Sequence, residues 1–240
     1  MKKLALALGV LALSTTGVFA QQTVRIATEG GYAPYNFIND KGEVDGYERE
    51  LGDELCKRAG LTCSWVVTDW DAIIPNLTAG NYDAIMAGMS ITEERKQKVA
   101  FTQNYTPPSA SLYVGLTAEP NIKGVVAAQT GTIQANHVAS TGATLLEFAT
   151  PDETIAAVRN GEADAVLADL DYLVPLVNES NGELHIHPEK VLLGGGVGMA
   201  VRQSDNELRE TFDKAIGEMK ADGSIQAMIT KWFGPDAENY

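Results

Sequence analysis

Residues 81–95 have the sequence Asn81-Tyr82-Asp83-Ala84-Ile85-Met86-Ala87-Gly88-Met89-Ser90-Ile91-Thr92-Glu93-Glu94-Arg95. The apolar part, 84–87, predicts a short buried strand, and Gly88 predicts a turn after it. Ser90-Ile91-Thr92-Glu93 is a capping-box pattern, which predicts a helix start with free backbone N–H groups. We therefore expect a strand, a turn and a helix N-terminus in close succession.

Arg95 stands in or near the first turn of this expected helix, where the helix dipole favours anions and disfavours a cation. A helix N-terminus beside an arginine fork is a good receptor for a carboxylate. The alternative is a surface Arg95 paired with Glu94 or Asp83, because exposed pairs are common and contribute only ~0–1 kcal/mol. The spacing alone leaves both interpretations open.

Strand and helix patterns alternate on both sides of this stretch, an order typical of an α/β fold with parallel strands and right-handed crossovers. The expected strands are 23–28, 63–67, 84–87, 109–115, 124–128, 145–148, 163–169 and 197–201. The expected helices are 47–59, 69–77, 152–160, 170–177, 205–220 and 225–233, with a further helix opening at 129–134; 101–108 is expected to be irregular.

A repeated sequence pattern indicates two similar lobes. Residues 79–85 and 160–166 both contain the expected end of a helix, then Asp-Ala, then an apolar strand. We expect lobe 1 to comprise 21–110 plus 196–240, and lobe 2 to comprise 111–195. The chain would cross between them near 109–113 and again near Gly194-Gly195-Gly196, whose flexible backbone suits a hinge. The predicted fold is thus α/β and two-lobed, each lobe a sheet flanked by helices, with a two-segment hinge.

A ligand cleft is expected between the lobes, since ligands of such sheets bind at the carboxyl ends of the strands. Several residues stand at those positions in the expected topology. They are Glu29, Tyr32, Trp70, 87–90 (Ala87, Gly88, Met89 and Ser90), Thr132 and Asp169.

The N-terminus has the pattern of a signal peptide over 1–20. Lys2 and Lys3 precede a short apolar segment, and Val18-Phe19-Ala20 is a small-residue cleavage site before Gln21. Removing the two lysines changes the formal net charge from -14 to -16. This acidic balance disfavours nucleic acid and anionic membranes and mildly favours cationic ligands. We expect an exported protein that begins near Gln21.

Cys56 and Cys63 are the two cysteines of the chain. An even pair in an exported protein indicates a disulfide. The bond would join a helix that ends near Gly60 to the strand that begins at Cys63. A redox site would have a tighter Cys-x-x-Cys spacing, and a metal site would need more ligands.

Three motifs of the chain are specific. They are 28–35 (Thr-Glu-Gly-Gly-Tyr-Ala-Pro-Tyr), 83–95 with Phe101-Thr102, and 198–202 (Gly-Met-Ala-Val-Arg). Through them the chain, from Val24 to Phe233, resembles the extracellular solute-binding proteins that deliver polar amino acids to ABC importers. Within that family it is most similar to arginine and lysine/arginine/ornithine binders, which implies a type II periplasmic-binding-protein fold, a monomer in the periplasm, no cofactor and the importer's membrane subunits as partners.

The resemblance also implies ligand-binding roles. Arg95 would hold the ligand α-carboxylate, together with Ser90 and the N–H groups of Thr132 and Ile133. Asp169 would accept the α-ammonium, although it is also placed to cap the following helix. Tyr32 and Trp70 would stack on the ligand side chain, and Glu29 would meet its distal cation, with arginine favoured over ornithine and lysine. Ala87, Gly88 and Ile133 replace the hydroxyl residues that are frequent at these positions, so fewer side-chain hydrogen bonds are expected.

Other interpretations are open to test. Glu29-Gly30-Gly31-Tyr32 also resembles binders of opines, and another polar amino acid is an alternative ligand. A few relatives of this fold are dehydratases, in which a cleft carboxylate such as Glu29 or Asp169 would serve as general acid. His185 and His187 share one strand face, which could bind a metal weakly, but no further Cys or His lies nearby in sequence. We expect a binding protein, neither an enzyme nor a metal protein, and a diffusing carrier in preference to a sensor module.

Overall fold

The computed structural model describes residues 23–235 and 237. The predicted signal peptide, 1–20, lies outside these residues. The strands are β1 Val24–Thr28, β2 Gly31–Tyr32, β3 Asn36–Ile38, β4 Val44–Asp45, β5 Cys63–Val67, β6 Ala84–Ile85, β7 Ala100–Thr106, β8 Ala110–Gly115, β9 Val125–Gln129, β10 Thr144–Phe148, β11 Ala165–Asp169, β12 His185–Leu192 and β13 Val197–Val201. The helices are α1 Tyr47–Ala59, α2 Trp70–Thr78, α3 Glu93–Lys96, α4 Ile133–Thr141, α5 Pro151–Arg159, α6 Leu170–Glu179, α7 Asn206–Ala221 and α8 Ser224–Phe233.

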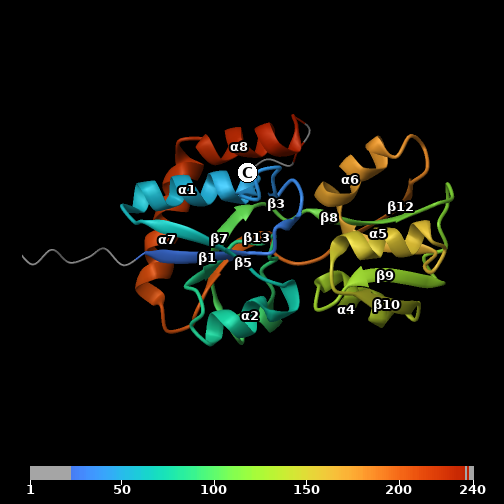
Figure 1. Cartoon of the computed structure of the whole chain (residues 1–240), viewed down its shortest axis with the longest axis horizontal. Coiled ribbons are helices and arrows are strands. Elements are labelled where there is room, and N and C mark those ends of the chain that lie inside the picture. Colours follow the sequence, from blue (N-terminus) through green and yellow to red (C-terminus); the bar gives the residue numbers. More distant parts are fainter. Residues whose placement is uncertain (1–22, 236, 238–240) are drawn as a thin grey trace, which may run out of the picture.

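The strands form two five-stranded sheets. Figure 1 shows these sheets in two separate lobes of the molecule. The first sheet has the order β5-β1-β6-β13-β7, and the second has the order β10-β9-β11-β8-β12. The predicted parallel pairing is confirmed for β5-β1-β6 and β10-β9-β11, whereas β13 and β8 run antiparallel to their neighbours. A small sheet of β2, β3 and β4 lies beside the first.

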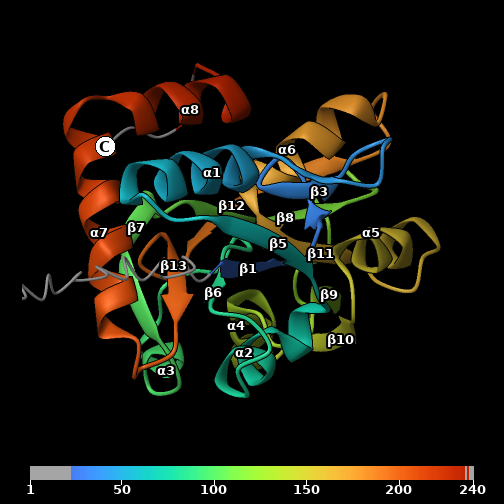
Figure 2. The same ribbon diagram turned by 60° about the vertical axis from the view of Figure 1, so that its left-hand side comes forward.

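Each main sheet is covered by helices on both faces, so its alternating side chains enter two separate cores. In the first lobe, α1, α7 and α8 pack on one face and α2 packs on the other; Figure 2 shows this layering. Ile26 faces the α1 side, and its neighbour Ala27 faces the α2 side. In the second lobe, α5 and α6 cover one face and α4 covers the other.

The chain passes between the sheets twice, between β7 and β8 and between β12 and β13. The second passage contains the triple glycine. Gly194 and Gly196 have φ of 76° and 86°. A Cβ on Gly196 would lie 2.5 Å from the carbonyl oxygen of Thr106, the last residue of β7, where the other passage begins. The two crossings are therefore in close contact, and only glycine fits at position 196 without backbone movement.

The predicted disulfide is confirmed. Cys56 and Cys63 are bonded with their Cα atoms 6.2 Å apart. The bond links the end of α1, which Gly60 caps in the left-handed conformation, to the start of β5.

Two local predictions were wrong. The segment 101–108, expected to be irregular, contains most of β7, an edge strand that pairs with β13 through register shifts. Its residues Gln103 and Asn104 are polar and form hydrogen bonds with Asp213 and Gly195. The segment therefore lacks the alternation of apolar and polar residues that marks a half-buried strand. The helix cap is Thr92 and not Ser90, because the Thr92 hydroxyl accepts from the Arg95 N–H, whereas Ser90 forms a β-bridge with Val197.

Asp83 links three strands of the first sheet at the end remote from the second lobe. Its carboxylate accepts hydrogen bonds from Arg25 and Arg202, each at 3.0 Å. Burial opposes ionisation, but the hydrogen bonds outweigh it and lower the pKa of Asp83 to about 2. The interpretation that paired Asp83 with Arg95 is therefore wrong.

We expect Asp83→Asn to lower the free energy of unfolding by about 2 kcal/mol at pH 7. A lowered pKa stabilises the fold at pH values above the unfolded-state pKa. The difference between wild type and variant should therefore shrink as the pH falls below 4 toward 2. Denaturant unfolding at pH 7 and pH 3 measures this. Asp53→Asn, which removes an exposed pair with Arg49, is the control and should change stability by less than ~0.5 kcal/mol.

Candidate functional site

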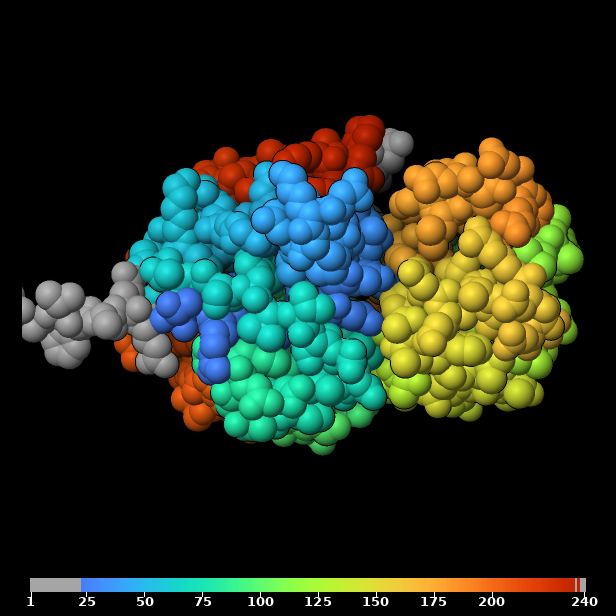
Figure 3. Space-filling view, in the orientation of Figure 1, coloured from blue at the N-terminus to red at the C-terminus, as the bar shows by residue number. Residues whose placement is uncertain are grey.

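A small cavity of about 30 Å³ lies between the two lobes, where strands of both sheets end. Figure 3 shows a furrow between the two halves of the molecule. All ten residues predicted for the ligand site line this cavity, together with two glutamines. The lining consists of Glu29, Tyr32, Trp70, Ala87, Gly88, Ser90, Arg95, Gln129, Thr132, Ile133, Gln134 and Asp169.

Arg95 is buried at the third position of the short helix α3, with 9% of its surface exposed. Its guanidinium donates to the carbonyl oxygens of Ser90, at 2.9 Å, and Gly131, at 3.3 Å. Burial lowers the pKa of Arg95 to about 10, partly offset by Asp169 and Glu94. Within 23–235 and 237, no carboxylate forms a salt bridge with it. Arg95 is thus a buried cation held by neutral carbonyls, which suits an incoming anion.

Asp169 ends β11 and occupies the N-cap position of α6, yet its side chain makes no capping hydrogen bond. Instead the carboxylate accepts from the Tyr32 hydroxyl at 2.8 Å, from Gln134 Nε2 at 2.7 Å and from Ser111 Oγ at 3.4 Å. Burial raises the pKa of Asp169 to about 6, and the Tyr32 hydrogen bond opposes the rise. Its carboxylate is therefore turned into the cavity, and the expectation that it also caps the helix through its side chain is wrong.

The N-terminus of α4 closes the second-lobe side of the cavity. Thr132 is the N-cap, and its hydroxyl accepts from the Ala135 N–H at 3.1 Å. The first amides of a helix lack intrahelical acceptors, and they sum to a partial positive charge. Thr132 and Ile133 thus bring a second electropositive group to the lining that also holds Arg95.

Glu29 follows β1 and forms the acidic end of the cavity. It accepts a 2.5 Å hydrogen bond from Gln129 Nε2, across the boundary between the lobes. Burial raises the pKa of Glu29 to about 7; Gln129 opposes this, and the charges of Asp69 and Asp152 add to it. These two aspartates and Asp71 line an adjoining cavity of about 300 Å³ whose lining contains no lysine or arginine. This end of the site therefore favours a cation.

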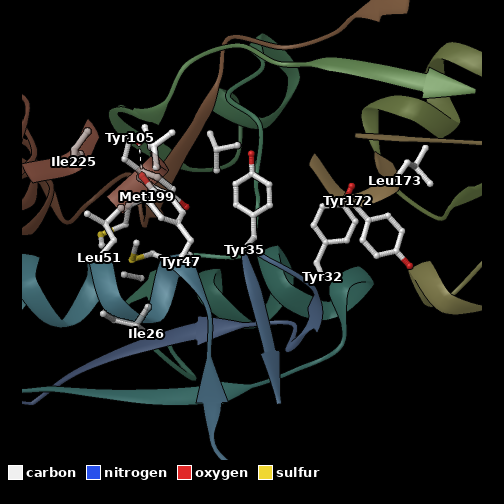
Figure 4. Packing of buried hydrophobic residues seen from close by; sticks show 14 of the residues in the cluster. Ile26, Tyr32, Tyr35, Tyr47, Leu51, Tyr105, Tyr172, Leu173, Met199 and Ile225 are labelled. Atoms are coloured by element: carbon white, nitrogen blue, oxygen red, sulfur yellow. Dashed lines mark hydrogen bonds between the residues drawn. The ribbon is translucent and has the colours of Figure 1, made fainter. Parts of the chain in front are cut away.

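The two predicted aromatic residues line the cavity, but each already packs one ring face on protein. Tyr32 stacks on Tyr172, with ring centroids 4.6 Å apart and an interplanar angle of 15°. Figure 4 shows the two rings side by side. Trp70 lies with its ring centroid 5.2 Å from the guanidinium carbon of Arg95. A cation–π contact of this kind stabilises Arg95 while it is buried.

Gly88 adopts φ 60°, and a Cβ there would lie 3.3 Å from the Tyr32 ring. The departure from a hydroxyl residue at this position therefore fits the tight approach of the backbone to Tyr32.

Sequence reasoning did not select Gln129 and Gln134. Gln129 ends β9, so the rule that placed Glu29 at a strand end also applied to it. Gln134 lies in the first turn of α4 and bonds to Asp169, a contact between residues 35 positions apart. Only the fold reveals that contact.

The two histidines considered as metal ligands lie elsewhere, on β12. His187 accepts from the Glu189 N–H and packs edge-on against Tyr113. In the described part of the chain, no group of three or more His, Cys, Asp or Glu residues is arranged to hold a metal. Nor does any helix among those residues have the length and apolarity to cross a membrane.

The profile of the bacterial extracellular solute-binding proteins, family 3, matches residues 24–235. This chain belongs to that family. The membership confirms the predicted resemblance, an extracytoplasmic location and a binding protein in place of an enzyme.

Known relatives of this family 3 protein bind amino acids. It is 36% identical to the histidine-binding periplasmic protein of Escherichia coli (strain K12), over 98% of both chains. It is 32% identical to the lysine/arginine/ornithine-binding periplasmic protein of the same organism, over 97% of both. A crystal structure of a periplasmic His/Glu/Gln/Arg/opine family-binding protein from Silicibacter pomeroyi in complex with lysine has 67% identity and a TM-score of 0.90, covering 91% of this chain and 100% of that one. These solved coordinates confirm the type II periplasmic-binding-protein fold.

Proposed function

We propose that this solute-binding protein captures a basic L-amino acid in the cavity between its lobes and delivers it to an ABC importer. The observation that supports this proposal is the charge of the cavity lining, which contains one arginine, Arg95, and two carboxylates, Asp169 and Glu29. A basic amino acid carries one carboxylate and two cations, so it matches this set charge for charge. Each charge that is buried on binding, in the ligand and in the site, then has a partner of opposite sign. Without these partners the cost of desolvation would be prohibitive.

In this proposal, the α-carboxylate binds Arg95 and the N-terminus of α4, and the α-ammonium binds Asp169. The side chain passes between Tyr32 and Trp70, and its distal cation meets Glu29. The partners come from both lobes, so ligand binding would favour the closed arrangement by a population shift. Lobe boundaries near 110 and 196, as the sequence predicted, and a monomeric carrier complete the proposal.

Arginine is the first candidate, because a carboxylate matches the fork of a guanidinium. The lysine/arginine/ornithine-binding relative supports all three ligands, and the lysine complex of the 67% identical protein supports lysine. All three ligands carry a cation at the end of the side chain, and Glu29 is the residue that would bind it.

The variant Glu29→Gln tests whether Glu29 binds the distal cation. We expect affinity for arginine and lysine to fall about 10- to 100-fold, since a hydrogen bond to a charged group contributes about 1.5–3 kcal/mol. Affinity for glutamine, which has no distal cation, should change far less. Calorimetric titration of the three ligands measures both. Glu43→Gln, in an exposed turn, is the matched control, and unchanged arginine affinity in Glu29→Gln would refute the assignment.

We also expect arginine affinity to fall with pH between 8 and 5. The pKa of Glu29 is raised to about 7 and that of Asp169 to about 6, so both take up protons in this range and must release them to bind a cation. The ligand itself keeps its charges there. The decrease should reach up to about tenfold per pH unit for each protonated carboxylate. In Glu29→Gln, the component near pH 7 should disappear; a flat profile in wild type would contradict the proposed roles.

A further inference from the structure

The geometry points to Glu48 as a positioning residue that holds two separate walls of the ligand cavity from behind, an inference that rests on the function proposed above. Glu48 is fully buried near the N-terminus of α1 and is not part of the cavity lining. It acts through hydrogen bonds to the segments that carry Glu29 and Ser90.

The first wall is the turn at Gly88. The Gly88 N–H donates to Glu48 Oε1 at 2.8 Å, so the carboxylate fixes the backbone between β6 and Ser90. The Tyr105 hydroxyl donates to the same oxygen from β7, the strand that leads to the first crossing between the lobes. The Tyr105 ring lies against Tyr47, with ring centroids 6.2 Å apart. Figure 4 shows these two side chains together.

The second wall is the loop that carries Glu29. Asn36 Nδ2 donates to Glu48 Oε2 at 2.7 Å, and Asn36 Oδ1 accepts from the Gly30 N–H at 2.7 Å. Asn36 is also fully buried. Glu48 is therefore connected through the Asn36 side chain to Gly30. Gly30 is the residue next to Glu29, the proposed partner of the distal cation.

The direction of these hydrogen bonds fixes the residue types. The Gly30 amide can only donate, so Asn36 must present its oxygen to it and its NH₂ group to position 48. Position 48 must then accept from Asn36, Gly88 and Tyr105 at once, which a carboxylate does and an amide does not. Burial raises the pKa of Glu48, and the hydrogen bonds from Tyr105, Gly88 and Asn36 oppose that rise.

Glu48→Gln is nearly isosteric and breaks this relay. If its oxygen keeps the bonds to Gly88 and Tyr105, its NH₂ group faces the NH₂ group of Asn36. Asn36→Asp breaks the relay from the other side, because it sets two carboxylates against each other. The double variant restores complementarity, since the new amide at position 48 donates to the new carboxylate at position 36, which still accepts from Gly30.

The experiment measures arginine and lysine affinity by calorimetry, and the ¹H–¹⁵N shifts and exchange rates of the Gly30 and Gly88 amides. We expect each single variant to weaken binding more than tenfold and to speed exchange of these amides. The double variant should recover most of both. Asp83→Asn is the matched control for a buried carboxylate at the other end of the sheet, and should lower stability without changing affinity.

Wild-type affinities in single variants that fold, or a double variant no better than either, would overturn the inference. Should a single variant fail to fold, recovery of folding and binding in the double variant supports it, and failure of the double contradicts it. Absence of binding by wild type would refute the proposed function instead, and the amide measurements would still decide the role of Glu48.

Discussion

Arg95→Ala is expected to abolish high-affinity binding of every α-amino acid, whatever its side chain. The guanidinium is buried, makes no salt bridge among the described residues and is bonded only to carbonyls of Ser90 and Gly131. Removing one partner of a buried ion pair costs about 3–5 kcal/mol, which corresponds to an affinity loss of about 100- to several-thousand-fold. Calorimetry with arginine, lysine and glutamine measures the loss.

Two controls separate this effect from damage to the fold. Lys96→Ala removes an exposed cation one residue further along α3 and should leave affinity unchanged. Agmatine, which is arginine without its carboxylate, should bind wild type and Arg95→Ala equally weakly. Arg95→Lys keeps a charge but loses the fork and should be intermediate. Retention of wild-type arginine affinity in Arg95→Ala would remove Arg95 from the site.

Asp169→Asn is expected to weaken binding at least ~100-fold, because it leaves the α-ammonium buried without a countercharge. The substitution also sets an NH₂ group among the donors Tyr32 and Gln134, which now bond to the carboxylate. The loss should apply to basic and neutral amino acids alike. This distinguishes Asp169 from Glu29, whose removal should affect basic ligands selectively.

The control for Asp169 lies at the other end of its strand. Asp164 accepts from the Val125 N–H and is exposed, so Asp164→Asn should leave affinity unchanged. The α-hydroxy analogue of arginine lacks the ammonium, and its affinity should be the same in wild type and Asp169→Asn. If the variant lost as much affinity for this analogue as for arginine, Asp169 would act on the fold and not on the ammonium.

The parts of the fold that the sequence predicted are those governed by local periodicity. Helix α1 and strands β5 and β13 occur where the patterns placed them, since each has a clear apolar face or apolar run. The cleft residues could be located because Glu29 and Gly88 come after strands β1 and β6 of the first sheet, and Asp169 ends strand β11 of the second. The carboxyl ends of these strands face the cleft. A topological rule therefore placed these side chains without any knowledge of their contacts.

The contacts that the sequence did not reveal join residues far apart in the chain. Strand β7 is recognisable only with β13 beside it, and Tyr32 meets Tyr172 only when the lobes face each other. Glu48 read as one more position of an amphipathic helix, yet it bonds to Gly88, 40 residues away. Hydrogen-bond partners of this kind depend on tertiary packing, which the periodicity of apolar residues does not reveal.

Titration of the unfolded and refolded wild-type protein against the common amino acids, one at a time, tests the central claim most directly. Refolding removes any ligand that accompanies the protein through purification. The account predicts one binding site, tightest binding by a basic amino acid with arginine first, and much weaker binding of glutamine. Tightest binding of glutamine or of an acidic amino acid, or no binding by any basic amino acid, would contradict it.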